Sequence, residues 1–169
     1  FMKFMAKHGY ICVIHDNRGH GKSVKNVEDL GYMYRGKARA FVEDIHQITL
    51  LIRERYPRLP VILFGHSMGS LAVRAYLKKY DSLIDMLIVC GSPSKNPGVI
   101  LGRMIAVVQG KLQGERHRSK LLEALSFGSF AARFPKETRK HAWICTDQLV
   151  VKEYEDSRLC GFTFTVDGY

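Results

Sequence analysis

A serine flanked by two glycines is the part of this sequence best suited to covalent chemistry. Gly65, Ser67 and Gly69 form a G-x-S-x-G pattern between an apolar run at 61–64 and a helical stripe that begins at Leu71. A nucleophilic serine on a tight strand-to-helix turn has a strained backbone, and the residues two positions before and after it must lack side chains because the chain passes close to itself. The alternative is a glycine-rich turn whose serine only caps the helix. We predict that Ser67 is a nucleophile and that the two glycines are structural residues of its turn.

The neighbours of Ser67 have different expected roles. The helix after the serine would direct its free N–H groups and the positive end of its dipole at a developing oxyanion. The backbone N–H of Met68, the residue after the nucleophile, is therefore the expected oxyanion donor. The side chain of His66 should point away from the serine on such a turn. Packing or hydrogen bonding is its favoured role, and contact with a substrate is the alternative.

A serine nucleophile also needs a base, and the base needs an acid that orients it. The chain order expected with this type of turn is serine, acid, histidine. Only His117 and His141 follow Ser67, and each lies in a basic run that is typical of a solvated surface. Asp85 begins an apolar run, whereas the acid is expected where a strand ends. We expect the base and the acid to lie outside these 169 residues.

The elements around this serine alternate between strands and helices. Continuous apolar runs at 10–14, 61–64 and 85–90 predict three strands, and stripes at helical spacing over 38–52 and from Leu71 predict the helices between them. Apolar strands that alternate with helices indicate a parallel sheet covered on both faces, with right-handed crossovers. The predicted fold class is therefore α/β, with three parallel strands and flanking helices.

The pattern changes after Pro97 to a mostly helical, irregular region. An apolar helix is predicted over 99–108, and a short helix over 119–125 begins with a serine suited to cap it. A further helix is expected to begin after Thr146 or Asp147. We accordingly divide the chain into a sheet-containing part, 1–94, and a helical part, 95–169.

Composition excludes several classes of protein. The formal charge is +10, but the surplus of Lys and Arg is spread along the chain, whereas nucleic-acid binders concentrate it. No apolar run approaches the ~18–20 residues of a membrane-spanning helix, and we identify no signal peptide. The four cysteines have irregular spacing, which predicts no metal site and favours a reducing, cytoplasmic location. Peripheral contact with a membrane and the oligomeric state stay open.

Three segments resemble a known family. The run Asp16-Asn17-Arg18-Gly19-His20-Gly21-Lys22-Ser23 resembles the D-x-R-G-H-G-x-S loop of α/β-hydrolases, and residues 65–70, Gly-His-Ser-Met-Gly-Ser, resemble their nucleophile elbow. Residues 145–164 resemble the cap of bacterial members. The branch is that of monoacylglycerol lipases and lysophospholipases, also called serine aminopeptidase-like hydrolases. Within the first loop, Asp16 and Arg18 are expected to pair with each other.

The resemblance implies a hydrolase of carboxylic esters that acts through an acyl-enzyme on Ser67, without a metal or organic cofactor. The substrate would be a lipid-like ester such as a monoacylglycerol or lysophospholipid. The helical part, 95–169, would be a cap, in which Leu149, Val150, Phe162 and Phe164 are candidates to line an acyl pocket. The resemblance also implies that the chain is an internal fragment of a longer protein.

Other readings of the same elbow stay open. A peptidase, a thioesterase or a carbon–carbon hydrolase could use the same serine turn. A non-catalytic protein with this fold that binds an apolar ligand or a partner is the alternative outside the enzyme class. A serine on a strained turn argues against the non-catalytic alternative, because a binding module does not need one.

Overall fold

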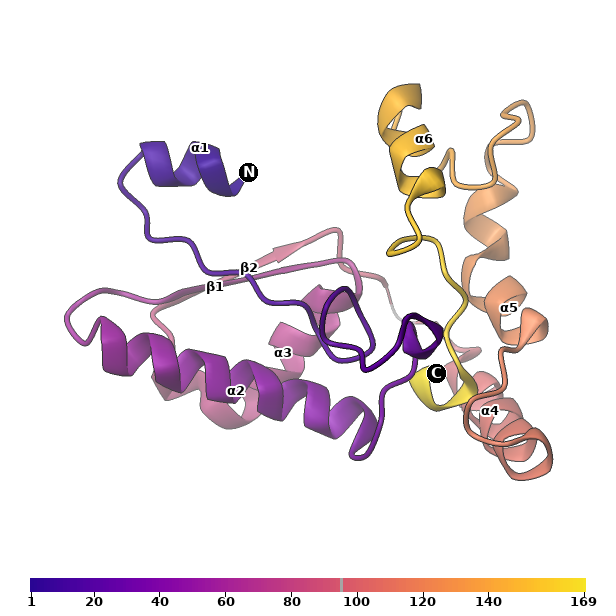
Figure 1. Cartoon of the computed structure of the whole chain (residues 1–169), viewed down its shortest axis with the longest axis horizontal. Coiled ribbons are helices and arrows are strands. Elements are labelled where there is room, and N and C mark those ends of the chain that lie inside the picture. Colours follow the sequence, from indigo (N-terminus) through magenta and orange to yellow (C-terminus); the bar gives the residue numbers. More distant parts are fainter. Residues whose placement is uncertain (95) are drawn as a thin grey trace.

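The computed structural model describes residues 1–94 and 96–169, which form a small α/β part followed by a helical part (Figure 1). Both strands lie before residue 91, and every element that the structure describes after them is a helix. In chain order they are α1 Met2–Lys7, η1 Val27–Asp29, α2 Lys37–Arg55, β1 Ile62–His66, α3 Met68–Tyr80, η2 Asp81–Leu83, β2 Met86–Cys90, α4 Val99–Gln113, α5 Lys120–Ala131, α6 Gln148–Asp156 and η3 Val166–Gly168.

Strands β1 and β2 pair in parallel, with Ile62 opposite Met86 and His66 opposite Cys90. Helix α3 connects them and packs against β1, and α2 packs against α3. This β-α-β unit confirms the prediction of parallel strands separated by helices. Figure 1 shows α2 and α3 on one side of the sheet and α1 on the other.

The core of this part lies between the sheet and the two long helices. Its buried residues come mainly from α2 and α3, and Leu63 and Leu87 of the sheet pack against them. The alternate strand residues point the other way: Phe64 is 43% exposed and Met86 is 54% exposed. Phe1, at the start of α1, stacks on Phe64 with 5.3 Å between ring centroids, but most of this face stays exposed. The expectation that both faces of the sheet are covered is therefore wrong in this structure. Side chains alternate along a strand, and helices α2 and α3 cover a single face.

The strand predicted over 10–14 is not formed. Within the described part of the chain, residues 10–14 have no regular structure and join no ladder, and their one backbone–backbone hydrogen bond runs from Tyr10 N to Met5 O at 3.2 Å. Ile14 is 75% exposed. An apolar run becomes a strand only when a neighbouring strand pairs with its backbone groups, and residues 10–14 have no such neighbour here.

Two of the later helices, α5 and α6, begin at side-chain caps, whereas α4 has none. The Ser119 hydroxyl accepts a hydrogen bond from Leu122 N at 3.1 Å and caps α5, as predicted. Of the two candidates before α6, Asp147 is the cap, because its carboxylate accepts from Leu149 N at 2.9 Å. Every helix in the described part of the chain is too short or too polar to cross a membrane.

The C-terminal segment returns to the α/β part and joins it through buried polar contacts. Met33 N donates to an Asp167 carboxylate oxygen at 3.0 Å, and the Thr165 hydroxyl donates to Gly31 O at 3.0 Å. Arg118 donates to Leu30 O at 2.6 Å. We call this set of contacts the junction. It fixes η3 against α2 and α4, so the helical part is held to the α/β part at its end as well as at its start.

Candidate active site

Ser67 occupies a single-residue turn between β1 and α3. Its φ is 51° and its ψ is −121°, and a positive φ is uncommon for a residue with a Cβ. Its N–H donates to Cys90 O at 3.0 Å, which attaches the turn to the end of β2. The residue is exposed. The backbone therefore presents the hydroxyl at the carboxyl end of the sheet instead of burying it or winding it into a helix.

The hydroxyl of Ser67 is not used to cap α3. Its side chain makes no capping hydrogen bond, and the Ser70 hydroxyl donates instead to the Ser67 carbonyl. Because α3 begins at Met68, the N–H of Met68 is in the first turn, where a helix has no acceptor for it within the helix. A free hydroxyl thus lies beside free backbone donors.

The two flanking glycines are not equivalent. A Cβ at Gly65 would lie 2.5 Å from Val73 Cγ2 and 2.6 Å from Gly69 O, so a side chain there would collide with α3. A Cβ at Gly69 would meet nothing within 4 Å. A side chain was expected to collide with its surroundings at both glycines, but it would do so only at Gly65. Gly69 lies inside the first turn of α3, with open space beside it.

His66 points away from the core and lies beside the end of β2. Its Nε2 is 3.1 Å from the place where a Cβ on Gly91 would sit, and the side chain is exposed. The ring therefore packs against the turn that follows β2, and a substrate role for it stays a prediction.

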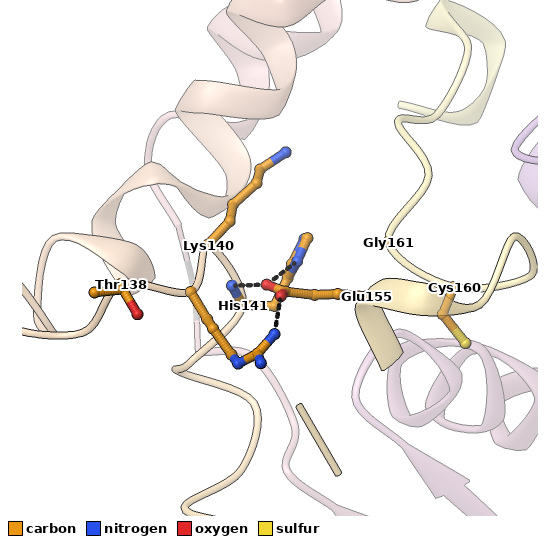
Figure 2. A pocket seen from close by; sticks show the side chains of 7 residues that line it. Thr138, Lys140, His141, Glu155, Cys160 and Gly161 are labelled. Atoms are coloured by element: carbon orange, nitrogen blue, oxygen red, sulfur yellow. Dashed lines mark hydrogen bonds and ion pairs between the residues drawn. The ribbon is translucent and has the colours of Figure 1, made fainter. Parts of the chain in front are cut away.

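His141 is held by Glu155, as Figure 2 shows. Its Nδ1 lies 3.2 Å from a Glu155 carboxylate oxygen, and its backbone N–H donates to the same oxygen at 3.0 Å. Arg139 donates to the other oxygen at 3.1 Å. The backbone N–H of His141, with Arg139 and the imidazole, holds the pKa of Glu155 below its ordinary value. With its side chain only 16% exposed, His141 is not the solvated histidine that the sequence predicts, since its partner comes from a separate helix.

The His141–Glu155 pair makes no contact with Ser67. It lines a cavity of about 560 Å³ in the helical part, together with Thr138, Arg139, Lys140, Cys160 and Gly161. His117 is half-buried, and its carbonyl accepts from Val166 N at 2.8 Å. Both histidines thus have structural contacts in the helical part.

The aspartates also have structural partners. Asp85 accepts from Val61 N at 2.7 Å and from Arg53 at 2.8 Å, which places it where both strands start. Ser67 lies where β1 ends. Asp147 caps α6, and Asp167 belongs to the junction. Sequence reasoning placed Asp85 at the start of its strand, and the structure confirms it.

A second cavity, of about 450 Å³, lies between α5, α6 and the C-terminal segment. Phe162 and Phe164 line it, together with Phe127, Trp143 and Tyr154. We call it the aromatic cavity.

Leu149 and Val150 do not reach the aromatic cavity. Leu149 is 72% exposed and Val150 is 44% exposed, whereas Val151 and Tyr154 of the same helix face inward. The geometry of α6 explains the difference, because neighbouring residues of a helix point in different directions. The sequence placed four residues at such a pocket, and the structure brings two of them there.

The loop after residues 10–14 contacts both parts of the chain. Arg18 forms a two-pronged ion pair with Asp44 of α2, with both distances 2.7 Å. Asp16 instead accepts from the Lys22 backbone N–H, so the predicted Asp16–Arg18 pair is wrong: a carboxylate on α2 matches the planar guanidinium better than one two residues away. His20 lies edge-on to Phe162, with 5.5 Å between ring centroids.

Comparison with known proteins identifies the family of this chain and several similar proteins. A family model described as serine aminopeptidase, S33, matches residues 1–169. A monoglyceride lipase homolog from Monkeypox virus is 33% identical over 93 residues, which is 55% of this chain and 28% of that protein. A monoacylglycerol lipase from Mycolicibacterium smegmatis (strain ATCC 700084 / mc(2)155) is 30% identical over 109 residues, 62% of this chain and 36% of that protein.

A solved structure shares the fold. It is a thermostable carboxyl esterase from Bacillus coagulans, with a TM-score of 0.80 and 23% sequence identity. The match covers 90% of this chain and 50% of the esterase. In each of these comparisons, the matched region therefore spans half or less of the related protein.

Proposed function

Because this chain belongs to the serine aminopeptidase S33 family and has an α/β-hydrolase fold, we propose that it is part of a serine hydrolase that cleaves carboxylic esters. The observation that carries the proposal is the conformation of Ser67. An exposed hydroxyl on a residue at φ 51°, between a parallel strand and a helix N-terminus, has the geometry of a nucleophile elbow.

The proposed reaction has two steps, and its base is not among the groups around the turn. The Ser67 oxygen attacks the ester carbonyl while a base removes its proton, and the Met68 N–H donates a hydrogen bond to the oxyanion that forms. The alcohol leaves with that proton, and an acyl-serine ester remains. Water, deprotonated by the same base, then releases the carboxylic acid and restores the hydroxyl. No step of this sequence draws on a metal or an organic cofactor.

The base and the acid are proposed to lie outside these 169 residues. The structural contacts of His117 and His141 in the helical part, and the place of Asp85 where the strands start, support this proposal. We also propose the division into a partial core, 1–94, and a cap, 95–169. The boundary between them adjoins Lys95, which is outside the described residues.

The proposed substrate is a lipid-like ester, such as a monoacylglycerol or a lysophospholipid. Two curated relatives are named for monoacylglycerol or monoglyceride hydrolysis, and the aromatic cavity offers Phe162 and Phe164 to an acyl chain. His66, at the end of the sheet beside Ser67, is proposed to contact the substrate near the scissile bond.

A fluorophosphonate probe, which labels activated serines, tests the proposal on the gene product that contains these residues. We expect covalent labelling at Ser67, and we expect Ser67→Ala to lose the label and at least about 10³-fold in ester hydrolysis. Labelling of another serine, or hydrolysis unchanged in Ser67→Ala, would contradict the assignment. A folded protein that binds ester analogues without labelling would instead support the non-catalytic alternative.

A further inference from the structure

The start of α3 differs from the starts of the other α-helices that the structure describes. In those helices, the carbonyl of the residue before the helix accepts a backbone N–H from four residues further on, as Ser119 O accepts from Glu123 N at 3.0 Å. The Ser67 carbonyl accepts instead from Ser70 N, three residues further on, at 2.9 Å. It also accepts from the Ser70 hydroxyl. A side chain thus adds a hydrogen bond to the carbonyl of the predicted nucleophile.

The bond from the Ser70 hydroxyl acts on the peptide group that joins Ser67 to Met68. The φ of 51° and ψ of −121° at Ser67 lie near those of the first central residue of a type II′ turn, about 60° and −120°. A type I′ turn has a similar φ at this position but a ψ of about 30°, so the two types differ mainly in the direction that their central peptide group faces. A contact with the Ser67 carbonyl therefore favours one of these two directions.

The direction of the Ser67 carbonyl also decides where the Met68 N–H points. A trans peptide group is planar, and its C=O and N–H point in opposite directions. With the carbonyl turned toward Ser70 inside α3, the Met68 N–H points out of the N-terminus of the helix, as the free N–H groups of a first turn do. A hydrogen bond to the carbonyl also polarises the peptide group, which makes its N–H a stronger donor.

We propose that Ser70 is the positioning residue of the oxyanion donor. Its hydroxyl fixes the Ser67 carbonyl and thereby directs the Met68 N–H at the oxyanion that forms on the ester. Ser70 is 0% exposed, so water does not compete for its hydroxyl, and the residue acts through the peptide group without touching the substrate. The inference rests on the proposed function of Ser67 and deepens it.

Matched variants separate the hydroxyl from the packing of the buried side chain. Ser70→Thr keeps a hydroxyl that can bond to a carbonyl three or four residues before it, whereas Ser70→Val has nearly the same shape without the hydroxyl. The cost of the added carbon is therefore common to both variants. Thr49→Val is the control on α2, because the buried Thr49 hydroxyl donates to Ile45 O at 2.9 Å, a bond of the same kind away from Ser67.

Hydrolysis of para-nitrophenyl butanoate by the gene product that contains these residues measures the effect on the reaction. Intact sites are counted with the fluorophosphonate probe, so that kcat refers to folded sites alone. We expect kcat to be about tenfold lower in Ser70→Val than in Ser70→Thr, less than the roughly 10²–10³-fold cost of losing a whole oxyanion donor. KM should be the same in both, because the oxyanion exists only after the attack. Thr49→Val should keep the kcat of the parent.

The Ser67 carbonyl can also be observed by NMR without any reaction. Ser67–Met68 is the one Ser-Met pair in the 169 residues, so ¹³C in serine carbonyls and ¹⁵N in methionine select this peptide group, and Ser67→Ala identifies its signal. We expect the ¹³C resonance to lie upfield in Ser70→Val compared with Ser70→Thr, since a carbonyl that loses a donor is less polarised. Thr49→Val should leave the resonance where it is in the parent.

Three results would overturn the inference. They are an equal carbonyl resonance in Ser70→Thr and Ser70→Val, an equal kcat per labelled site in these two variants, and a loss of kcat that Thr49→Val shares. A parent protein that is neither labelled nor active would instead contradict the proposed function of Ser67. In that case, a resonance that follows the hydroxyl would still show that Ser70 holds this peptide group.

Discussion

The conformation of Ser67 is maintained by contacts on both sides of the turn. Its N–H is bonded to Cys90 O on β2, and its carbonyl accepts from the Ser70 hydroxyl on α3. A residue with a Cβ stays at positive φ only where its surroundings over-determine the backbone, at a cost of about 1–3 kcal/mol. The absence of a side chain at Gly65 is part of that arrangement, because it lets α3 begin directly above the strand. The direction of the Ser67 side chain is therefore determined by the backbone of the turn itself.

Substitution of the two glycines should separate the position that needs space from the one that does not. Gly65→Ala should lower the free energy of unfolding by about 1–3 kcal/mol, since its Cβ would overlap Val73 and the Gly69 carbonyl. Gly69→Ala should leave it unchanged or raise it by up to about 1 kcal/mol, because alanine is the better helix former and the space is open. Urea unfolding of the two variants measures both changes. Equal losses at the two positions would show that this account of the turn is wrong.

Side-chain caps mark where α5 and α6 begin. Asp147 and Ser119 each accept a backbone N–H from the first turn of their helix. Strands are different. The apolar run at 10–14 has the composition of a strand, but no neighbouring strand pairs with it here. The backbone hydrogen bonds of a helix form within the helix and its caps, whereas those of a strand need a second segment of chain.

The choice between the two cap candidates of α6 can be measured. Asp147→Ala should lower the free energy of unfolding by about 1 kcal/mol, because Leu149 N would lose its acceptor. Thr146→Ala should change it by less than about 0.5 kcal/mol, since Thr146 is exposed and is not the cap. Urea midpoints for the two single variants provide the comparison. A larger loss of stability in Thr146→Ala than in Asp147→Ala would show that Thr146 is the cap and that α6 begins one residue earlier.

At the scale of the whole molecule, the junction joins segments that lie far apart in the sequence. Asp167 accepts from Met33 N, 134 residues away, and Asp29 pairs with Arg116 across 87 residues. The Arg116 guanidinium, with the Tyr34 hydroxyl, keeps the pKa of Asp29 below its ordinary value even though the side chain is buried. At Asp167 burial dominates and raises the pKa. Asp29 and Asp167 therefore have opposite effects on how the stability of the fold depends on pH.

Asp167→Asn should change how stability depends on pH. With a folded pKa above the ordinary 3.8, Asp167 binds its proton more tightly in the folded state. The folded protein therefore loses stability as pH rises from 3.8 through the folded pKa, and the penalty persists at neutral pH. An asparagine amide can still accept from Met33 N and can donate to the Thr165 hydroxyl, so the variant should be at least as stable as the parent at pH 8.

Urea midpoints of parent and variant at pH 4 and pH 8 test this prediction. The stability of Asp167→Asn relative to the parent should be greater at pH 8 than at pH 4. A relative stability that is the same at both values, or that falls toward pH 8, would show that the carboxylate is ionised in the folded state without penalty.

Much of the α/β part could be predicted from the sequence. The helices α2 and α3, both strands of the sheet and the turn at Ser67 follow from apolar spacing and glycine placement within windows of about twenty residues. The strand over 10–14, the Asp16–Arg18 pair and the solvated His141 were wrong for one shared reason. In each case the outcome depended on a neighbour contributed by another element: a pairing strand, Asp44 of α2, or Glu155 of α6.

The order of the elements from α2 to β2, and the position of Ser67 between a strand and a helix, could be predicted without the structure. Helical spacing, strand alternation and cap chemistry depend only on residues close together in the sequence. They can therefore be recognised without knowing which other segments pack against them. Three features could be found only from the folded chain: long helices on a single face of the sheet, the contact of Glu155 with His141, and the cavity that Phe162 and Phe164 line together with α5. Those features arise where distant segments meet, and the path by which the chain returns determines which side chains come into contact.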